Sequence, residues 1–126
     1  MKRSCFFFVI ALVGAGCGGE PKPLPPATTP EASRAALIAA FDAWKQGATY
    51  DQLSTQSPPV YLQDDDFTRG RRLIAYEIEG EPKMIGIGMS YVVVLTFADG
   101  PKPNRRLAYR VVTDPHTSVS REDRSP

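Results

Sequence analysis

The sequence has few histidines and cysteines, the residues that ligate zinc and that supply imidazole bases and thiol nucleophiles. It contains one histidine, His116, and two cysteines, Cys5 and Cys17. Both cysteines lie near the N-terminus, so we expect the folded domain to have neither a disulfide nor a free thiol. Zinc sites need several cysteine or histidine ligands, and three such residues, two of them near the N-terminus, exclude a zinc site in the folded domain. We expect no cofactor.

An excess of charge of either sign is also missing. The chain has 15 Lys and Arg residues against 14 Asp and Glu residues, and a net charge of +1. Proteins that bind nucleic acid neutralise phosphates with a marked basic excess on one face, so we expect no nucleic-acid partner. Long apolar runs are absent too. The longest lies in residues 6–13, well below the roughly 20 residues that span a bilayer.

That short apolar run has the order of a secretory signal. Lys2 and Arg3 precede it, and Gly14, Ala15 and Gly16 follow it before Cys17. An uncleaved N-terminal anchor helix is the alternative. Residues 14–17 resemble the lipobox of bacterial lipoproteins. The resemblance implies cleavage after residue 16, diacylglycerol on the thiol of Cys17, and a further acyl chain such as palmitate on its amino group.

The resemblance to lipoproteins implies a protein of the cell envelope, held by lipid and facing the periplasm or the exterior. Gly18 is not the aspartate that often retains such proteins at the inner membrane, which favours the outer membrane. Residues 17–29 are rich in proline and predict an extended tether that reaches about 35 Å at most. We interpret it as a spacer; a ligand for a proline-binding groove is the alternative.

Residues 30–123 predict a single folded domain, followed by a disordered tail at residues 124–126. Thr29, Pro30 and Glu31 have the order of a helix start. An apolar stripe with helical spacing follows, and Gly47 predicts the end of the helix. The stripe consists of Leu37, Ala40, Phe41 and Trp44. Thr49 to Gln52 has the spacing of a capping box and predicts a short second turn.

The rest of the chain predicts strands. We expect them near residues 60–62, 72–79, 87–98, 107–112 and 117–121, with turns at residues 80–83 and 99–104. Ile74, Tyr76 and Ile78 should share one face. The predicted fold class is α+β, with one N-terminal helix packed on an antiparallel meander of three to five strands. Its inner face would carry Tyr76, Tyr91, Val93, Leu95 and Tyr109.

This order of elements resembles the cystatin-like folds, which include the nuclear-transport-factor-like and ketosteroid-isomerase-like families. Residues 40–47, with Leu53 after them, are similar to the first helix of many members. Residues 57–78 are similar to uncharacterised small bacterial lipoproteins. The resemblance implies a cystatin-like α+β domain and brings no activity with it. The inhibitory Gln-x-Val-x-Gly segment of cystatins is absent from both predicted turns.

Two groups of residues could carry chemistry. His116, or Asp114 two residues before it, could act as a general base, but an Asp-Pro turn near the C-terminus predicts a solvated histidine. Residues 64–66, which are three aspartates, could bind a hard cation such as Ca²⁺. No second acidic cluster is near in sequence, so we expect a solvated loop. We assign no catalytic or metal-ligating residue.

Arginines gather at the starts of two predicted strands. In a meander these two strands run in the same direction, so the arginines should meet at one end of the sheet. They could bind an anionic partner, either an envelope protein or anionic lipid. The alternative is ordinary neutralisation by Asp99 and residues 64–66. The arginines concerned are Arg69, Arg71, Arg72, Arg105 and Arg106.

The sequence therefore predicts a membrane-anchored envelope lipoprotein with a non-enzymatic binding or accessory domain. Two alternatives remain open at this point. One is a small pocket enzyme of the ketosteroid-isomerase-like or dehydratase-like type, and the other is a structural envelope protein. An enzyme would need an apolar pocket with a buried titratable group on the inner face of the sheet.

Overall fold

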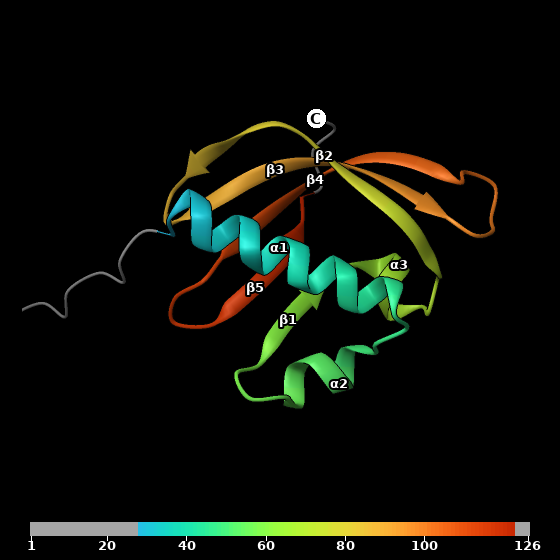
Figure 1. Cartoon of the computed structure of the whole chain (residues 1–126), viewed down its shortest axis with the longest axis horizontal. Coiled ribbons are helices and arrows are strands. Elements are labelled where there is room, and N and C mark those ends of the chain that lie inside the picture. The colour runs from blue at the N-terminus through green and yellow to red at the C-terminus, as the bar shows by residue number, and fades with distance from the viewer. Residues whose placement is uncertain (1–27, 123–126) are drawn as a thin grey trace, which may run out of the picture.

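The computed structural model describes residues 28–122 (Figure 1). The predicted signal peptide, Cys17, most of the tether and the predicted tail lie outside the described residues. The described chain is α+β, with a five-stranded and mostly antiparallel sheet. No helix in this part of the chain is long and apolar enough to cross a membrane. Its elements are α1 (Pro30–Lys45), α2 (Tyr50–Thr55), β1 (Val60–Gln63), α3 (Asp65–Thr68), β2 (Leu73–Ile85), β3 (Gly88–Phe97), β4 (Asn104–Val112) and β5 (Thr117–Arg121).

The helix α1 begins and ends as its sequence predicts. The hydroxyl of Thr29 accepts a hydrogen bond from the amide of Ala32 at 3.2 Å, and Pro30 occupies the first turn. Gly47 has a φ of +87° just after the helix, a conformation that glycine adopts without strain. The predicted apolar stripe is buried, with Ser33 added to it. The hydroxyl of Ser33 lies 2.5 Å from that of Tyr91, which satisfies both polar groups in the core.

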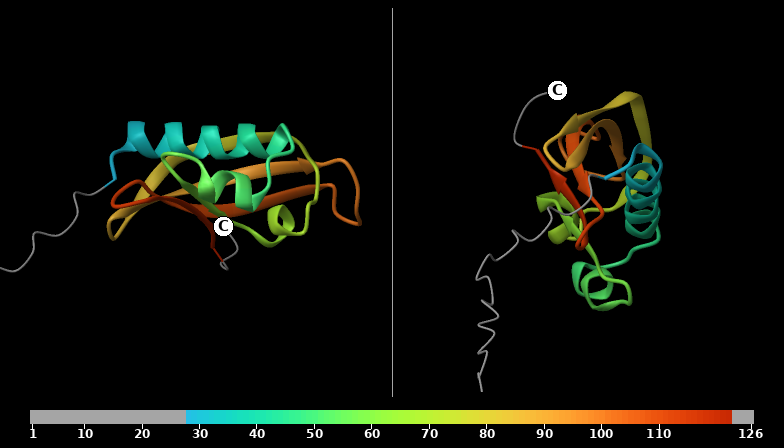
Figure 2. Two further views of the ribbon diagram at one scale, coloured as in Figure 1. Left: turned by 90° about the horizontal axis from the view of Figure 1, so that it is seen from below. Right: turned by 90° about the vertical axis from the view of Figure 1, so that its left-hand side faces the viewer.

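The stripe of α1 packs on one face of the sheet (Figure 2). On β3 the alternate side chains are buried as predicted, and the strand lies inside the sheet between β2 and β4. Phe41 meets Tyr109 edge to face, with 5.0 Å between ring centroids, and Trp44 lies 5.6 Å from Phe97. These aromatic contacts pack α1 against the inner face of the sheet.

The strand order differs from a simple meander at one strand. The order is β1-β5-β4-β3-β2, so β2 to β5 form the predicted antiparallel meander. β1 instead pairs parallel with β5 at the far edge, with Leu62 opposite Val119. Parallel neighbours need a long connection, and the whole meander provides it. The sequence indicated that β1 is a strand but contained nothing to show that its partner is the last one.

The prediction of one N-terminal helix was incomplete. α2 was expected as a short turn, and its capping box forms between Thr49 and Gln52. α3 was not expected. The carboxylate of Asp64 accepts hydrogen bonds from the amides of Asp66 and Phe67 and so caps this short helix. Side-chain capping by aspartate turns the segment that we predicted as a loop into a helical turn.

The predicted turn at residues 80–83 was wrong. β2 continues through these residues to Ile85, and the hairpin turns at Gly86, whose φ is +60°. Glycine and proline at positions 80 and 82 interrupt the ladder between Glu79 and Lys83 without ending the strand.

The predicted face of β2 was also wrong, at Ile74. The register shifts between Leu73 and Ala75, and Ile74 is 52% exposed while Leu73 and Tyr76 face α1. An inserted residue of this kind reverses the alternation of side chains locally.

The sheet has two distinct ends (Figure 1). At one end the amide of Thr28 donates to the carbonyl of Ile87 at 2.9 Å, and the Thr28 hydroxyl accepts from the amide of Thr113 at 3.1 Å. We call this the Thr28 end. β3 runs from there to Phe97, which pairs with Leu73 at the start of β2. This opposite end, with the β3–β4 loop and the five arginines named above, we call the arginine end.

Candidate functional site

At the arginine end, three guanidinium groups surround one carboxylate. Asp66 is 8% exposed. Its Oδ1 lies 3.5 Å from Nη1 of Arg71, and its Oδ2 lies 3.1 Å from Nη1 of Arg105 and 3.3 Å from Nη1 of Arg121. These arginines come from the start of β2, from β4 and from β5. One carboxylate does not balance three guanidiniums, and the buried carboxylate of Asp64 offsets part of the remaining positive charge.

Asp64 lies beside this cluster and is 4% exposed. Besides capping α3, its Oδ2 accepts a short hydrogen bond from the hydroxyl of Tyr109. Burial raises the pKa of Tyr109 far above its ordinary value, and the adjacent carboxylate of Asp64 raises it further. The prediction of a solvated loop at residues 64–66 was therefore wrong for Asp64 and Asp66. The amides of α3, the phenol and the arginines together compensate the burial of these carboxylates.

Arg71 holds several elements together. Its Nη2 donates to the carbonyls of Asp99 and Lys102, each at 2.9 Å, and its guanidinium lies 3.9 Å from the ring centre of Phe97. Its own carbonyl accepts from the indole N–H of Trp44 at 2.8 Å. Arg71 thus links the β3–β4 loop, the start of β2 and the end of α1. The guanidinium group of Arg71 is therefore occupied by contacts within the protein.

The other arginines of the predicted set have different surroundings. Arg106 pairs with Glu79, with 2.6 Å between Nε and Oε2, and is exposed. Arg69 and Arg72 are exposed, and neither forms an ion pair within residues 28–122. The structure therefore brings Arg71 and Arg105 together on Asp66 and leaves Arg69 and Arg72 facing solvent.

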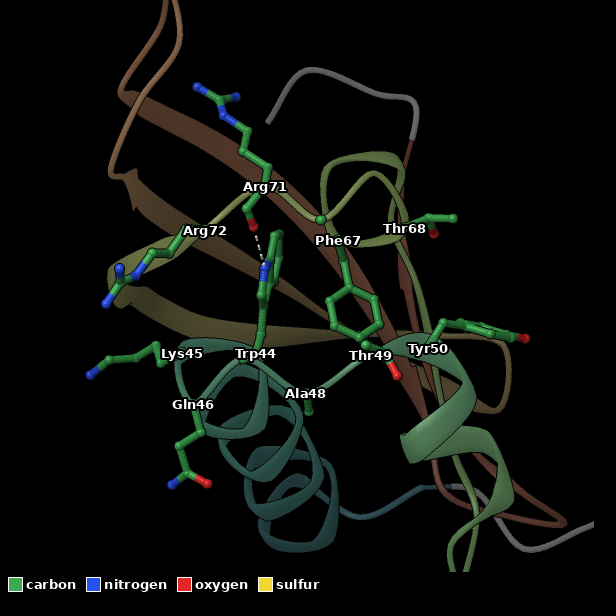
Figure 3. A pocket seen from close by; sticks show the side chains of 12 residues that line it. Trp44, Lys45, Gln46, Ala48, Thr49, Tyr50, Phe67, Thr68, Arg71 and Arg72 are labelled. Atoms are coloured by element: carbon green, nitrogen blue, oxygen red, sulfur yellow. Dashed lines mark hydrogen bonds between the residues drawn. The ribbon is translucent and has the colours of Figure 1, made fainter.

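A pocket of about 400 Å³ opens beside Arg72 (Figure 3). Its aromatic walls are Trp44, Phe67 and Tyr50, which come from α1, α3 and α2. Trp44 and Phe67 meet edge to face, with 5.4 Å between ring centroids. Because the indole N–H is already donated to the carbonyl of Arg71, Trp44 offers the pocket only its ring. The complete lining is Trp44, Lys45, Gln46, Gly47, Ala48, Thr49, Tyr50, Phe67, Thr68, Gly70, Arg71 and Arg72.

The charges around this Trp44 pocket are of one sign. Lys45 and Arg72 lie on the same side of it, whereas the side chain of Arg71 turns away toward Asp66 (Figure 3). The lining contains no carboxylate, imidazole or thiol. The ammonium group of Lys45 lies 5.9 Å from the ring centre of Tyr76, on the side of α1 that faces β2, so Lys45 and Arg72 stand at the rim of the pocket. A cationic rim beside aromatic walls is suited to a ligand with an anionic group and an apolar or planar body.

A second, more open groove runs between α1 and β2, and its charges compensate each other. The hydroxyl of Tyr76 donates to Oδ1 of Asp42 at 2.8 Å. Burial and this carboxylate raise the pKa of Tyr76 to about 12. Arg34 and Lys45 line the same groove. With both signs of charge present, this groove has less preference for an anion than the Trp44 pocket.

The remaining candidates lie away from the pocket. His116 is exposed at the Thr28 end, where its ring stands edge-on to Tyr61 with 6.1 Å between centroids. Asp114 lies in the same loop, which joins β4 to β5 at the Thr28 end and so at the opposite end of the sheet from Arg72. Within residues 28–122 no group of three histidine, cysteine or acidic side chains could hold a metal ion.

Sequence reasoning missed Arg121 and the pocket itself, and it placed Tyr109 on the inner face of the sheet without its hydrogen bond to Asp64. Arg121 ends the last strand and reaches Asp66 only because β5 lies beside β4. The pocket forms between three helices that are separate in sequence. A comparison with known proteins gives no family, no curated protein and no solved structure that matches this chain.

Proposed function

We propose that this chain is a lipid-anchored protein of the bacterial cell envelope whose folded domain binds an anionic ligand without catalysing a reaction. The Trp44 pocket carries the proposal. Its lining combines aromatic walls with Lys45 and Arg72 and includes no acidic side chain. The absence of a carboxylate, imidazole or thiol from that lining is why we propose binding and not proton transfer.

The position of the pocket favours a partner in the envelope over the lipid of the anchoring membrane. The described chain begins at Thr28, and β3 spans about 33 Å from that end to the arginine end at 3.3 Å per residue. A lipid on Cys17 would be attached through residues 18–27, which join the domain at the Thr28 end. The arginine end is then the end farther from the point of attachment, and we propose an acidic segment of another envelope protein as its partner.

We further propose that the domain is cystatin-like. The support is the way in which the long helix α1 lies across one face of a curved and mostly antiparallel sheet (Figure 2). This likeness concerns the fold alone and adds no activity to the proposal.

The test is binding of poly-L-glutamate by the Cys17→Ser chain without its signal peptide, measured by calorimetry at low and high salt. Replacing Lys45 and Arg72 with glutamine should weaken binding by about tenfold for each charge-assisted hydrogen bond removed. High salt should weaken the wild type in the same direction, because exposed charges are screened over about 8–10 Å near physiological ionic strength.

Arg106→Gln is the matched control. Arg106 is an exposed arginine at the same end of the sheet, but it pairs with Glu79, and neither residue lines the pocket. The Arg106→Gln variant should leave the affinity for poly-L-glutamate unchanged. Equal losses in the control and in the Lys45 and Arg72 variant would mean that only general charge attracts the polymer, and the pocket would then not be the site.

A further inference from the structure

Three large apolar side chains are exposed together at the turn of the β2–β3 hairpin. Met84 is 63% exposed, Ile85 36% and Ile87 39%. We call residues 84–87 the hairpin tip. The one other exposed large apolar side chain of the described residues is Ile74. A cluster of exposed apolar side chains on a small domain marks a surface that contacts another apolar phase.

The hairpin tip lies where the chain enters the domain from its N-terminal segment. The carbonyl of Ile87 accepts the hydrogen bond from the amide of Thr28, and Thr28 is 3% exposed. Thr113 fixes the same residue from the other side through the Thr28 hydroxyl. The tip and the point of entry are thus held next to each other.

The length of the preceding segment makes this position informative. Residues 17–27 precede Thr28, and a proline-rich chain of this length reaches about 35 Å when extended. An acyl group on Cys17 would therefore keep the hairpin tip within reach of the bilayer without forcing contact. The surface of the tip then decides whether the domain lies on the membrane or stands away from it.

We propose that the hairpin tip inserts into the interfacial region of the bilayer that holds the acyl chains of Cys17, an inference that rests on the anchoring proposed above. Insertion removes Met84, Ile85 and Ile87 from water. Lys83 precedes them and is exposed, so its ammonium group can remain among the headgroups while its stem follows the apolar side chains. The strands then lead from the membrane to the arginine end.

The experiment uses the lipidated protein in phosphatidylethanolamine and phosphatidylglycerol vesicles, with an environment-sensitive fluorophore on Ile87→Cys. Acylation of the Cys17 thiol leaves the new cysteine as the reactive one. The matched control is Lys102→Cys, in the β3–β4 loop at the arginine end. We expect emission at position 87 to shift to the blue and to be quenched by spin-labelled lipid, with neither effect at position 102. Equal behaviour at the two positions would overturn insertion.

The intact mass of the same preparation separates this inference from the anchoring. Acylated protein without quenching at position 87 contradicts insertion alone, whereas a mass without acyl chains contradicts the anchoring. A second measurement does not depend on acylation. In the Cys17→Ser chain, Met84→Ser with Ile87→Ser should reduce flotation with vesicles, and unchanged flotation would overturn insertion. A blue shift that appears without vesicles and grows with protein concentration would assign the tip to a second copy of the chain and overturn it too.

Discussion

At the scale of single residues, Tyr109 and Asp64 form a buried polar contact beside the arginine cluster. Tyr109 is fully buried, and its hydroxyl is donated to a carboxylate that also caps α3. The phenol therefore satisfies an acceptor that water does not reach. A buried acceptor without a partner is expensive, so this hydrogen bond is one on which the local structure depends.

Tyr109→Phe should lower the free energy of unfolding at neutral pH by about 1–3 kcal/mol, because Oδ2 of Asp64 loses its buried donor. Urea denaturation measures the change. Tyr76→Phe is the control, since that hydroxyl bonds Asp42 at the surface, and it should have a smaller effect. Equal losses of stability in the two variants would show that the buried hydrogen bond contributes no more to stability than the one at the surface.

The same pair predicts how stability depends on pH. Folding raises the pKa of Tyr109 and Tyr76, so the folded state holds both phenolic protons more tightly than the unfolded state. The stabilisation is complete below the unfolded pKa of about 10 and is lost as pH rises above it. Unfolding should become easier above about pH 10, and less steeply in Tyr109→Phe. A wild-type midpoint of urea denaturation that stays constant from about pH 9 to 12 would contradict this loss of stability.

Part of the residue-scale arrangement could have been predicted from the sequence. Residues 105, 107, 109 and 111 share one face of β4, so alternation alone places Arg105 toward the core and Arg106 away from it. Asp64 and Asp66 could not be separated from a solvated acidic loop in this way. Their burial depends on Tyr109 and Arg121, which are distant in sequence and come close only in the folded sheet.

At the scale of elements, α1 depends on a single large side chain near its C-terminus. Trp44 is 3% exposed, packs between Phe67 and Phe97, and donates its indole N–H to Arg71. It therefore joins α1 to α3, to β3 and to the start of β2. It also forms a wall of the pocket.

Trp44→Ala should lower the free energy of unfolding by about 3–5 kcal/mol through the loss of buried aromatic area and the cavity that remains. The melting temperature, followed by circular dichroism, measures it. Ile74→Ala is the matched control, because that large apolar side chain is half exposed and should change stability by less than about 0.5 kcal/mol. A Trp44→Ala variant that melts with the wild type would show that α1 does not need this side chain.

The elements that the sequence predicted well are those whose pattern is local. The apolar stripe of α1 and the alternating side chains of β3 each indicate which face of the element is buried. The elements predicted poorly depend on distant partners or on backbone irregularity. The position of β1 in the sheet depends on its pairing with β5. β2 continues past Gly80 and Pro82 because its pairing with β3 resumes at Lys83.

At the scale of the whole molecule, the proposed anchoring depends on Cys17. A Cys17→Ser variant should no longer incorporate labelled palmitate and should move from the membrane fraction to the soluble fraction, because the acylated thiol is gone. Cys5→Ser is the matched control. It changes the other cysteine, which lies in the predicted signal peptide, and should retain the label. Label remaining on Cys17→Ser would contradict the lipobox prediction.

The parallel pairing of β1 with β5 has a consequence for the order in which the domain is completed. Val60 lies opposite Thr117, so one edge strand acquires its partner only when the last strand is present. If a chain crosses a membrane with its N-terminus first, β5 crosses last. During translocation β1 therefore has no partner strand. Under the export that we propose, the pairing of β1 with β5 would form only after the last strand has crossed, so the sheet would be completed on the far side of the membrane.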